Sequence, residues 1–176
     1  MKYCSNCGNR VSLKIPEGDT HARFVCDNCH VIHYQNPRMV VGCLPIWDDK
    51  ILICKRAIEP KYGLWTLPAG FMENGETVEE GALRETLEES GAEVKIERLH
   101  SLYSLPQANQ VYAIYLANMT SAYFDPGTES LECKLITVDQ IPWDEIAFTA
   151  IKFSLKKYVE NLTLKSKSTF LGRLNK

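Results

Sequence analysis

Two closely spaced cysteine pairs near the start of the chain constrain its fold most strongly. The pairs are Cys4/Cys7 and Cys26/Cys29, each with two residues between its members, and eighteen residues separate them. Each pair can form a tight knuckle whose thiolates point at one ion, and two knuckles complete a tetrahedral four-sulfur Zn²⁺ site. A unit this small buries little apolar surface, so bound zinc would supply much of its folding energy. We therefore expect a structural zinc ribbon over residues 1–36.

Other polar residues of this segment bear on what the ribbon does. Histidines that could replace a cysteine ligand are His21, His30 and His33. Because four thiolates already complete the site, we expect none of them to bind the metal. The basic residues are scattered and are offset by nearby acids, whereas a nucleic-acid-binding face normally shows a clustered basic patch. The ribbon is therefore expected to be structural or dimer-forming, and nucleic acid is not expected as a partner.

The composition is typical of a globular protein. Hydrophobic residues make up 45% and charged residues 24% of the 176 residues, which is enough apolar material for a core. The net charge of −2 gives no bulk attraction to nucleic acid or to an anionic membrane. There is no apolar run of membrane-spanning length, and the first residues contain no apolar signal segment. We expect a cytoplasmic, reducing setting, in which the remaining cysteines are core residues rather than disulfides.

Apolar, β-branched segments after residue 37 predict a domain of mixed strands and helices. The runs 39–47 and 51–54 flank a short turn and are typical of a hairpin of buried strands. Asp139 is placed to cap a short turn, and from about residue 161 the chain is polar and lysine-rich, so we expect a frayed tail. Such a pattern favours an α+β fold, most simply an α/β/α sandwich around a mixed sheet. Further strands are expected over 94–105, 110–119 and 131–138, and a helix over 148–158.

An acidic stretch over residues 70–92 lies in the middle of this domain. It contains seven glutamates and a single basic residue, Arg84. Carboxylates this close repel one another, so a folded segment of this kind calls for a positive partner. A divalent metal ion is the simplest candidate.

A helix over residues 78–90 is predicted within the acidic stretch. Thr77 is placed as its N-cap, Glu80 as the capping-box partner and Gly91 as the residue that ends it. Residues three and four apart share one side of a helix, which gives this helix an apolar side and a carboxylate side. The expected apolar side is Ala82, Leu83, Thr86 and Leu87, and the carboxylate side is Glu85, Glu88 and Glu89.

Three carboxylates within one helical turn can bind hard divalent cations through oxygen. Mg²⁺ keeps several waters and shares its coordination with substrate phosphates. Such a site neutralises the oxygens of a phosphoanhydride and lowers the pKa of a bound water, so that the water can attack phosphorus. A solvated acidic helix face is the alternative interpretation, and the spacing alone does not separate the two.

The acidic stretch resembles the Nudix box at every charged and glycine position. The matching pattern is Gly70-x5-Glu76-x7-Arg84-Glu85-x2-Glu88-Glu89-x-Gly91. Thr86 and Ala92 depart from the family pattern, and both are packing positions. Over residues 3–160 the chain resembles the Nudix branch of plant and bacterial FAD and ADP-ribose diphosphatases with an N-terminal zinc ribbon. The segments that carry this wider resemblance are YQNPRMVVG, KRAIEPKYGLWTLPAGF and PGTESLEC.

The resemblance implies roles for the residues of the box. Arg84 would orient the glutamates, and Glu76 would brace the junction between loop and helix. In the family, a metal-activated water attacks one phosphorus of a nucleoside diphosphate linked to another moiety and releases two monophosphates. The ligands implied for catalytic Mg²⁺ or Mn²⁺ are Glu85, Glu88, Glu89 and the carbonyl of Gly70.

The general base differs between branches of the family, so the resemblance leaves it open. It is either a glutamate of the box or one on a later loop, where this chain offers Glu129 and Glu132. We favour Glu129 because it lies in the more flexible segment, with a plain surface carboxylate as its alternative role.

Contacts to the substrate must come from outside the box. An adenine or flavin ring needs a flat partner, and phosphate needs a cation. NADH-cleaving relatives carry Ser-Gln-Pro-Trp-Pro-Phe-Pro soon after the box, whereas this chain has SLYSLPQ over residues 101–107. The difference argues against NADH and NAD-capped RNA as preferred substrates. The candidate contacts are Trp65, Phe71, Tyr103 and Tyr112 for the ring, and Lys55 and Arg56 for phosphate.

Taken together, these patterns predict a metal-dependent hydrolase of FAD or ADP-ribose, which yields AMP plus FMN or ribose 5-phosphate. One alternative is a sister enzyme that cleaves NADH or a nucleoside triphosphate, and another is a nucleotide-sensing regulator without turnover. We expect a zinc ribbon over 1–36, a Nudix domain over 37–162 and a polar tail over 163–176. The expected partners are a small-molecule nucleotide and a second copy of the chain, since homodimers are the commonest soluble oligomers.

Overall fold

The computed structural model describes residues 1–174, which divide into two compact units. The first unit is Met1–Pro37 and the second begins at Arg38, one residue beyond the border expected from the sequence. Within the described residues, neither helix combines the length and the apolar character needed to cross a membrane.

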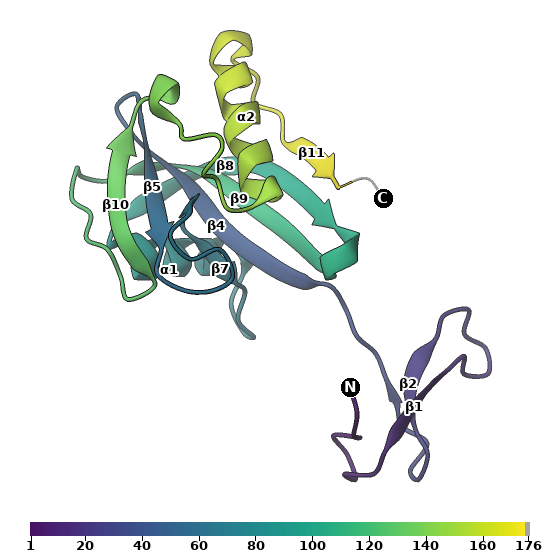
Figure 1. Ribbon diagram of the computed structural model, residues 1–176. Helices are drawn as coiled ribbons and strands as arrows, with labels where there is room; N and C mark the ends of the chain where they lie inside the picture. Colours follow the sequence, from purple (N-terminus) through teal and green to yellow (C-terminus); the bar gives the residue numbers. More distant parts are fainter. Residues whose placement is uncertain (175–176) are drawn as a thin grey trace. The chain divides into compact units, whose positions relative to one another are not determined.

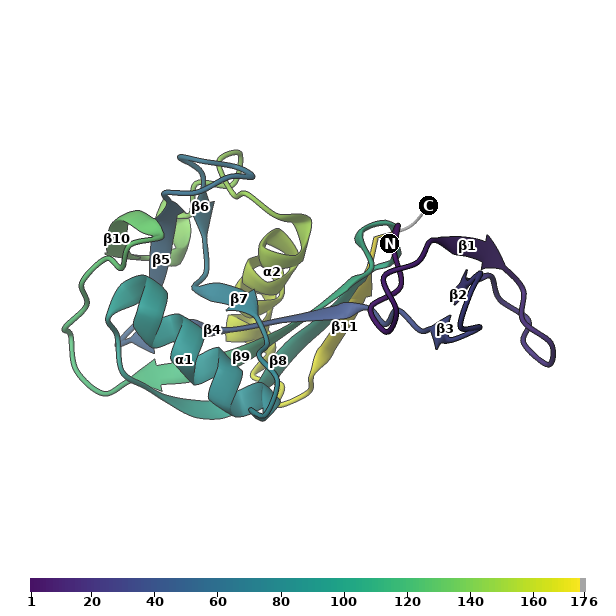
Figure 2. The same ribbon diagram turned by 90° about the horizontal axis from the view of Figure 1, so that it is seen from below.

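The first unit is a small antiparallel sheet with strand order β1-β2-β3 (Figures 1 and 2). Its buried apolar side chains, among the residues described, are only Cys4, Val25 and Cys26. Two of these three are predicted zinc ligands, so the unit has almost no core apart from its metal site. The strands are β1 (Val11–Lys14), β2 (Arg23–Cys26) and β3 (Ile32–His33).

The second unit is built on one mixed sheet with the main strand order β10-β5-β4-β9-β8-β11. Strands β4 and β9 pair in parallel, as do β8 and β11, while the other neighbours are antiparallel. The two short strands β6 and β7 pair with β5 and β4. The bounds are β4 (Arg38–Trp47), β5 (Lys50–Arg56), β6 (Trp65–Thr66), β7 (Ala69–Phe71), β8 (Val94–Leu105), β9 (Gln110–Met119), β10 (Ser130–Ile136) and β11 (Phe170–Arg173). The helices are α1 (Val78–Ser90), α2 (Thr149–Leu164) and the 3₁₀ turns η1 (Pro106–Ala108) and η2 (Val138–Gln140).

The two helices cover opposite faces of this sheet (Figures 1 and 2). Alternate residues of β4 show why, since successive side chains of a strand point to opposite faces. Val40 and Leu44 pack with Ile151 of α2, whereas Val41 packs with Ala82 of α1. The expected α/β/α sandwich with a mixed sheet is thus confirmed.

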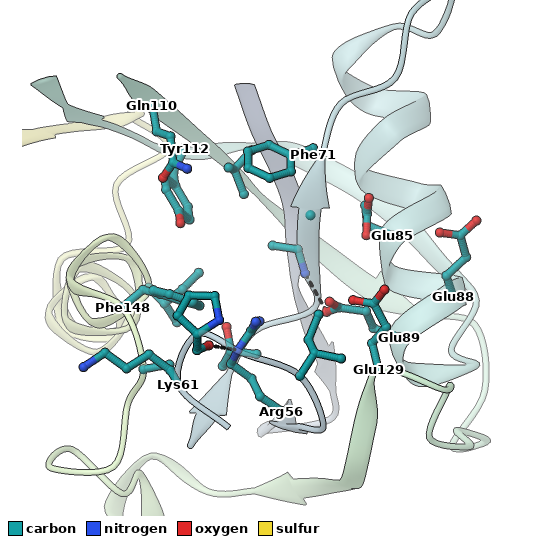
Figure 3. Close-up of a pocket in the computed structure, with 18 of the residues that line it drawn as sticks. Arg56, Lys61, Phe71, Glu85, Glu88, Glu89, Gln110, Tyr112, Glu129 and Phe148 are labelled. Atoms are coloured by element: carbon teal, nitrogen blue, oxygen red, sulfur yellow. Dashed lines mark hydrogen bonds between the residues drawn. The ribbon is translucent and has the colours of Figure 1, made fainter. Parts of the chain in front are cut away.

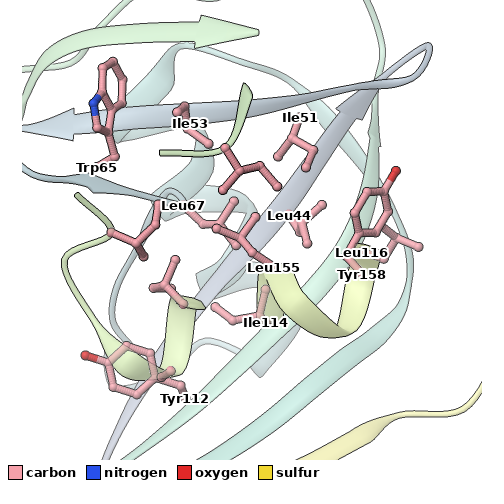
Figure 4. Packing of buried hydrophobic residues seen from close by; sticks show 14 of the residues in the cluster. Leu44, Ile51, Ile53, Trp65, Leu67, Tyr112, Ile114, Leu116, Leu155 and Tyr158 are labelled. Atoms are coloured by element: carbon pink, nitrogen blue, oxygen red, sulfur yellow. The ribbon is translucent and has the colours of Figure 1, made fainter. Parts of the chain in front are cut away.

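The larger part of the core lies between the sheet and α2 (Figure 4). Leu44, Ile51, Ile53, Ile114 and Leu155 are fully buried there. Burying each such side chain contributes about 1.5–3 kcal/mol before the entropy cost of folding is subtracted. This layer is the rigid base on which the site rests.

The hairpin expected from residues 39–54 is closed only at its turn. Strands β4 and β5 pair at Ile46 with Ile51 and at Trp47 with Lys50, and then diverge. Beyond that point β7 takes the place beside β4, and β6 the place beside β5. The divergence makes room beside β4 and β5 for these two short strands.

The C-terminal part of the chain differs from expectation. The predicted frayed tail is wrong in two places, because α2 continues to Leu164 and residues 170–173 form β11. Phe170 packs against His100 with ring centroids 5.4 Å apart, and β11 pairs in parallel with β8. The short turn η2 is capped by Thr137 rather than by Asp139, which lies inside it.

Candidate active site

The four cysteines of the first unit form a complete ligand set for zinc. Their sulfur atoms all lie within 4.8 Å of one another. The Sγ atoms of Cys4 and Cys29 are 3.7 Å apart, and those of Cys7 and Cys26 are 3.4 Å apart. Tetrahedral zinc with Zn–S bonds of about 2.3 Å places its sulfurs about 3.8 Å apart, so the quartet fits this metal.

Neighbouring N–H groups donate hydrogen bonds to sulfurs of the cysteine quartet. The backbone N–H groups of Asn28 and Cys29 each donate to Cys26 Sγ at 3.4 Å. The Asn9 backbone and side chain donate to Cys7 and lower its pKa to about 6. His33 Nε2 lies 3.2 Å from a ligand sulfur, so this histidine contacts the zinc site without belonging to the quartet.

Helix α1 of the second unit has the caps that its sequence predicts. Thr77 Oγ1 accepts a bond from the Glu80 N–H at 3.2 Å, and Glu80 Oε2 accepts one from the Thr77 N–H at 2.7 Å. At the other end, Gly91 adopts a φ of 63° and its N–H donates to Leu87 O. The start and end of the helix, and therefore the positions of its glutamates, are confirmed.

The face on which α1 packs differs from expectation. Ala82 and Thr86 are fully buried, but Leu83 and Leu87 are 37% and 50% exposed, so the expected apolar side is wrong for the two leucines. The buried face instead begins at Gly81, where a Cβ would lie 2.8 Å from Val41 Cγ2. Small side chains allow the helix to approach the sheet closely, and this rotation turns Glu89 inward.

Arg84 is the hub of the acidic stretch. Its guanidinium donates to both carboxylate oxygens of Glu76, at 2.8 and 3.0 Å. The same group donates to Glu85 at 2.8 Å, to Glu88 at 3.1 Å and to the Phe71 carbonyl at 3.1 Å. The hydrogen bonds from Arg84 lower the pKa of Glu76 to about 2. Arg84 therefore orients two box glutamates while Glu76 anchors the arginine.

Glu89 is the buried carboxylate of the stretch, and Glu85 is half-buried. Glu89 is 7% exposed and accepts a bond from the Ala69 N–H at 2.9 Å. Burial raises its pKa to about 8, and burial also raises the pKa of Glu85. Glu85 occupies the space beside Gly70 that a side chain there would fill.

These residues fit a hard divalent cation. Buried carboxylates without a full set of partners are stabilised by a nearby cation, and oxygen is the ligand that Mg²⁺ prefers. Across residues 1–174 the cysteine quartet is the only close group of three or more potential ligands, so the glutamate oxygens are further apart than the cysteine sulfurs. The residues that would hold the cation are Glu85, Glu88, Glu89 and the Gly70 carbonyl.

A cavity of about 1140 Å³ opens beside these glutamates (Figure 3). Ligand pockets in proteins commonly measure about 300–1,000 Å³, so the space suffices for a substrate with two large moieties. Its walls differ in chemistry, as Figure 3 shows. The carboxylate wall is Glu85, Glu88, Glu89 and Glu129; the cationic wall is Arg56 and Lys61 beside Phe148; the remaining wall includes Phe71, Gln110 and Tyr112.

Arg56 has the surroundings of an anion-binding group. It is only 8% exposed, its Nε donates to Pro60 O at 2.9 Å, and its guanidinium lies 5.0 Å from the Phe148 ring centroid. In the part of the chain that the structure describes, it forms no ion pair with a carboxylate. A buried cation of this kind is stabilised by an anion in the cavity.

Two aromatic residues that the sequence suggests as substrate contacts lie outside the lining of this cavity. Trp65 is 3% exposed, and the ammonium groups of Lys55 and Lys134 lie 5.5 and 4.0 Å from its ring centroid. Tyr103 is 7% exposed and packs on Phe153. Neither residue is among those that line the cavity, and neither is Lys55.

Several residues of the cavity are not predicted from the sequence, and Lys61, Gln110 and Phe148 are the polar and aromatic ones among them that Figure 3 labels. Lys61 and Phe148 come from a loop and from the start of α2, and Gln110 is the first residue of β9. Lys61 lies in the KRAIEPKYGLW segment that carries the wider resemblance, which is a usable signal. Nothing in their local sequence marks Gln110 or Phe148, because only the pairing of distant strands brings them to the cavity.

Comparison with known proteins supports what the geometry indicates. A family model described as NUDIX domain matches residues 36–159, and one described as Nudix N-terminal matches residues 2–35. An ADP-ribose pyrophosphatase from Methanocaldococcus jannaschii is 31% identical over 130 residues, which cover 72% of this chain and 75% of that protein. The NAD-capped RNA hydrolase NudC of Photorhabdus laumondii is 30% identical over 145 residues, covering 80% of this chain. The chain spans about half the length of that relative, 53%.

Solved structures show the same relationship. A NUDIX hydrolase from Nitrosomonas europaea superposes with a TM-score of 0.95 and 53% identity, covering 100% of both chains. An ADP-ribose pyrophosphatase from Streptococcus suis gives a TM-score of 0.63 at 19% identity over 79% of this chain, a likeness of fold alone. The NUDIX domain family model covers most of the sequence, and the glutamates of the box line one cavity. We therefore conclude that the chain belongs to the Nudix hydrolase family and carries that family's N-terminal zinc ribbon.

Proposed function

We propose that this Nudix hydrolase is a metal-dependent diphosphatase of ADP-ribose or FAD, which releases AMP plus ribose 5-phosphate or FMN. The observation that carries the proposal is a cavity that brings the carboxylates of α1 together with the buried Arg56, which forms no ion pair with a carboxylate among residues 1–174. A diphosphate bridge matches both walls, because its oxygens can be shared between a cation held by the glutamates and the Arg56 guanidinium.

The residues of the chain divide the work of phosphoanhydride cleavage. Bound Mg²⁺ or Mn²⁺ supplies charge neutralisation and an acidified water when present. Arg84 keeps Glu85 and Glu88 oriented toward the cavity. Arg56, on the cationic wall of the cavity, binds the phosphoryl group. Glu129 acts as the general base and takes the proton of the attacking water.

The shape of the cavity supports a substrate with two moieties around the diphosphate. Phe71 is 44% exposed and offers a flat surface for an adenine or flavin ring, with Tyr112 two strands away on the same face. One relative with 31% identity bears the name ADP-ribose pyrophosphatase. We also propose a homodimer, which light scattering of the purified protein would test.

NADH is the second candidate substrate, because several relatives at about 30% identity bear the name NAD-capped RNA hydrolase. The segment that lacks the NADH-type motif, residues 101–107, ends beside the cavity, where Leu105 and Ala108 form part of its wall. Because this segment differs from the NADH-type motif and ends at the cavity wall, the difference changes the surface that a substrate meets. We therefore rank ADP-ribose and FAD above NADH.

A panel of substrates tests this proposal. Purified protein with Mg²⁺ or Mn²⁺ is given ADP-ribose, FAD, NADH and dATP, and the products are separated by chromatography. The expected result is faster cleavage of the first two, abolished by chelation and lowered by orders of magnitude in Glu89→Gln. Preferred cleavage of NADH would favour the second candidate, and a wild-type rate in Glu89→Gln would move the metal site elsewhere.

A further inference from the structure

The segment 125–129, which leads to Glu129, is bonded to the C-terminal end of α1. The Asp125 N–H donates to Ser90 O at 2.8 Å, and the Gly127 N–H donates to Glu89 O at 3.1 Å. The last four carbonyls of a helix have no partner within the helix and need one from outside. Two of these positions in α1 are thus filled by the backbone of this segment.

The far end of the segment is bonded to the end of β5. Glu129 O accepts a bond from the Ala57 N–H at 2.8 Å, directly after Arg56. The Ser130 N–H donates back to Gly127 O at 3.0 Å, which closes a tight turn around the glutamate. Glu129 is therefore held from both sides, between the carboxylates of α1 and the cationic wall of the cavity (Figure 3).

The lining of the cavity agrees with this placement of Glu129. Glu85, Glu89 and Glu129 all line the same cavity, so the segment that ends at Glu129 brings a further carboxylate to those of α1.

The contact between segment and helix requires a residue without a side chain at Gly127. A Cβ there would overlap the Glu88 carbonyl oxygen and would lie 3.3 Å from Glu89 Cα. The φ of Gly127 is outside the left-handed region, so the requirement is steric rather than conformational. The helix cannot retreat, because Thr86 and Ser90 are fully buried beneath it. An added methyl group would instead push the exposed segment away from α1.

We infer that Gly127 is a positioning residue for catalysis: it lets segment 125–129 dock on the end of α1 and so fixes Glu129 beside the metal-binding glutamates. This inference rests on the proposed function, in which Glu129 accepts a proton from the attacking water. Gly127 touches no substrate and acts only through the glutamate two residues later.

The first test compares Gly127→Ala with Asp125→Ala. Asp125→Ala is the matched control, because it truncates a side chain in the same segment and keeps the N–H bond to Ser90. Displacing a catalytic group by about 1 Å costs about 10²-fold in rate, so Gly127→Ala should lower kcat for ADP-ribose toward that extent. KM and the Mn²⁺ affinity measured by calorimetry without substrate should stay close to those of the control. Equal kcat in the two variants would overturn the inference.

A double-mutant cycle asks whether Gly127 acts through Glu129. Glu129→Gln should lower kcat by about 10²-fold or more, as loss of a general base does. Adding Gly127→Ala to it should then cause little further loss, because the glutamate is already removed. Losses that multiply, or a normal kcat in Glu129→Gln, would overturn the positioning role. Absence of ADP-ribose and FAD turnover by the unaltered protein would instead overturn the proposed function.

Discussion

At the scale of single residues, Arg56 gives the sharpest prediction about the substrate. Its Nε is occupied by Pro60 O and its face by Phe148, which leaves the remaining N–H groups for the cavity. Hydrogen bonds to charged groups contribute about 1.5–3 kcal/mol, so Arg56→Ala should lower kcat/KM for ADP-ribose about ten- to a hundredfold.

The neighbouring Lys55→Ala is the control for Arg56→Ala, since this lysine lies over Trp65 and does not line the cavity. It should leave the steady-state kinetics unchanged. A loss in Lys55→Ala as large as that in Arg56→Ala would show that general charge, and not the buried guanidinium, attracts the substrate.

A second prediction at this scale concerns Glu76 and the acid stability of the fold. Arg84 holds the pKa of Glu76 at about 2 instead of its usual 4.5. A carboxyl whose folded pKa is depressed stabilises the fold above its unfolded pKa and loses that contribution as the pH falls toward the folded value. The Tm should therefore fall between about pH 5 and pH 2, and Glu76→Gln should lower the Tm at neutral pH and flatten this fall. The exposed Glu93→Gln serves as control and should retain the wild-type pH profile.

At the scale of elements, the acidic helix shows what sequence can predict. Its start, end and capping box follow from bonds between residues three or four apart, and the structure has all of them. Its buried face does not follow from local pattern. Leu83 and Leu87 suggest an apolar stripe, but the close approach of Gly81 to Val41 selects the small residues for the interior. Tertiary packing against the sheet, and not the hydrophobicity of the individual side chains, therefore determines which face of the helix is buried.

The strands show the same division between local and distant contacts. Strands β8 and β9 were predicted from their own residues, whereas β11 was not, because a polar tail with Phe170 carries no alternating pattern. Its order comes from pairing with β8, some seventy residues earlier, where Phe170 lies opposite Ser101. The lining of the cavity shows the same division. The spacing of the box glutamates predicts that they lie together, but only the strand order shows that Gln110 and Phe148 also reach the cavity.

At the scale of the whole molecule, the two units are stabilised by different interactions. The second unit buries a large apolar core on both faces of its sheet. In the first unit, the described buried apolar side chains are two cysteines and one valine. Binding energy for zinc is therefore folding energy in the ribbon, while the second unit folds on its own packing.

Removal of zinc should consequently unfold one unit and spare the other. In Cys26→Ser, a ligand with almost no exposed surface is lost, and we expect hydrogen exchange to lose protection over residues 1–37 but to keep it over 38–174. Turnover of ADP-ribose should persist, because every residue that lines the cavity lies between Val40 and Ile151. The buried Cys43→Ser is the control: it leaves the zinc site intact, and it should retain bound zinc and protection of the ribbon. Loss of activity in Cys26→Ser with protection intact over 38–174 would mean that the ribbon contributes to the reaction directly.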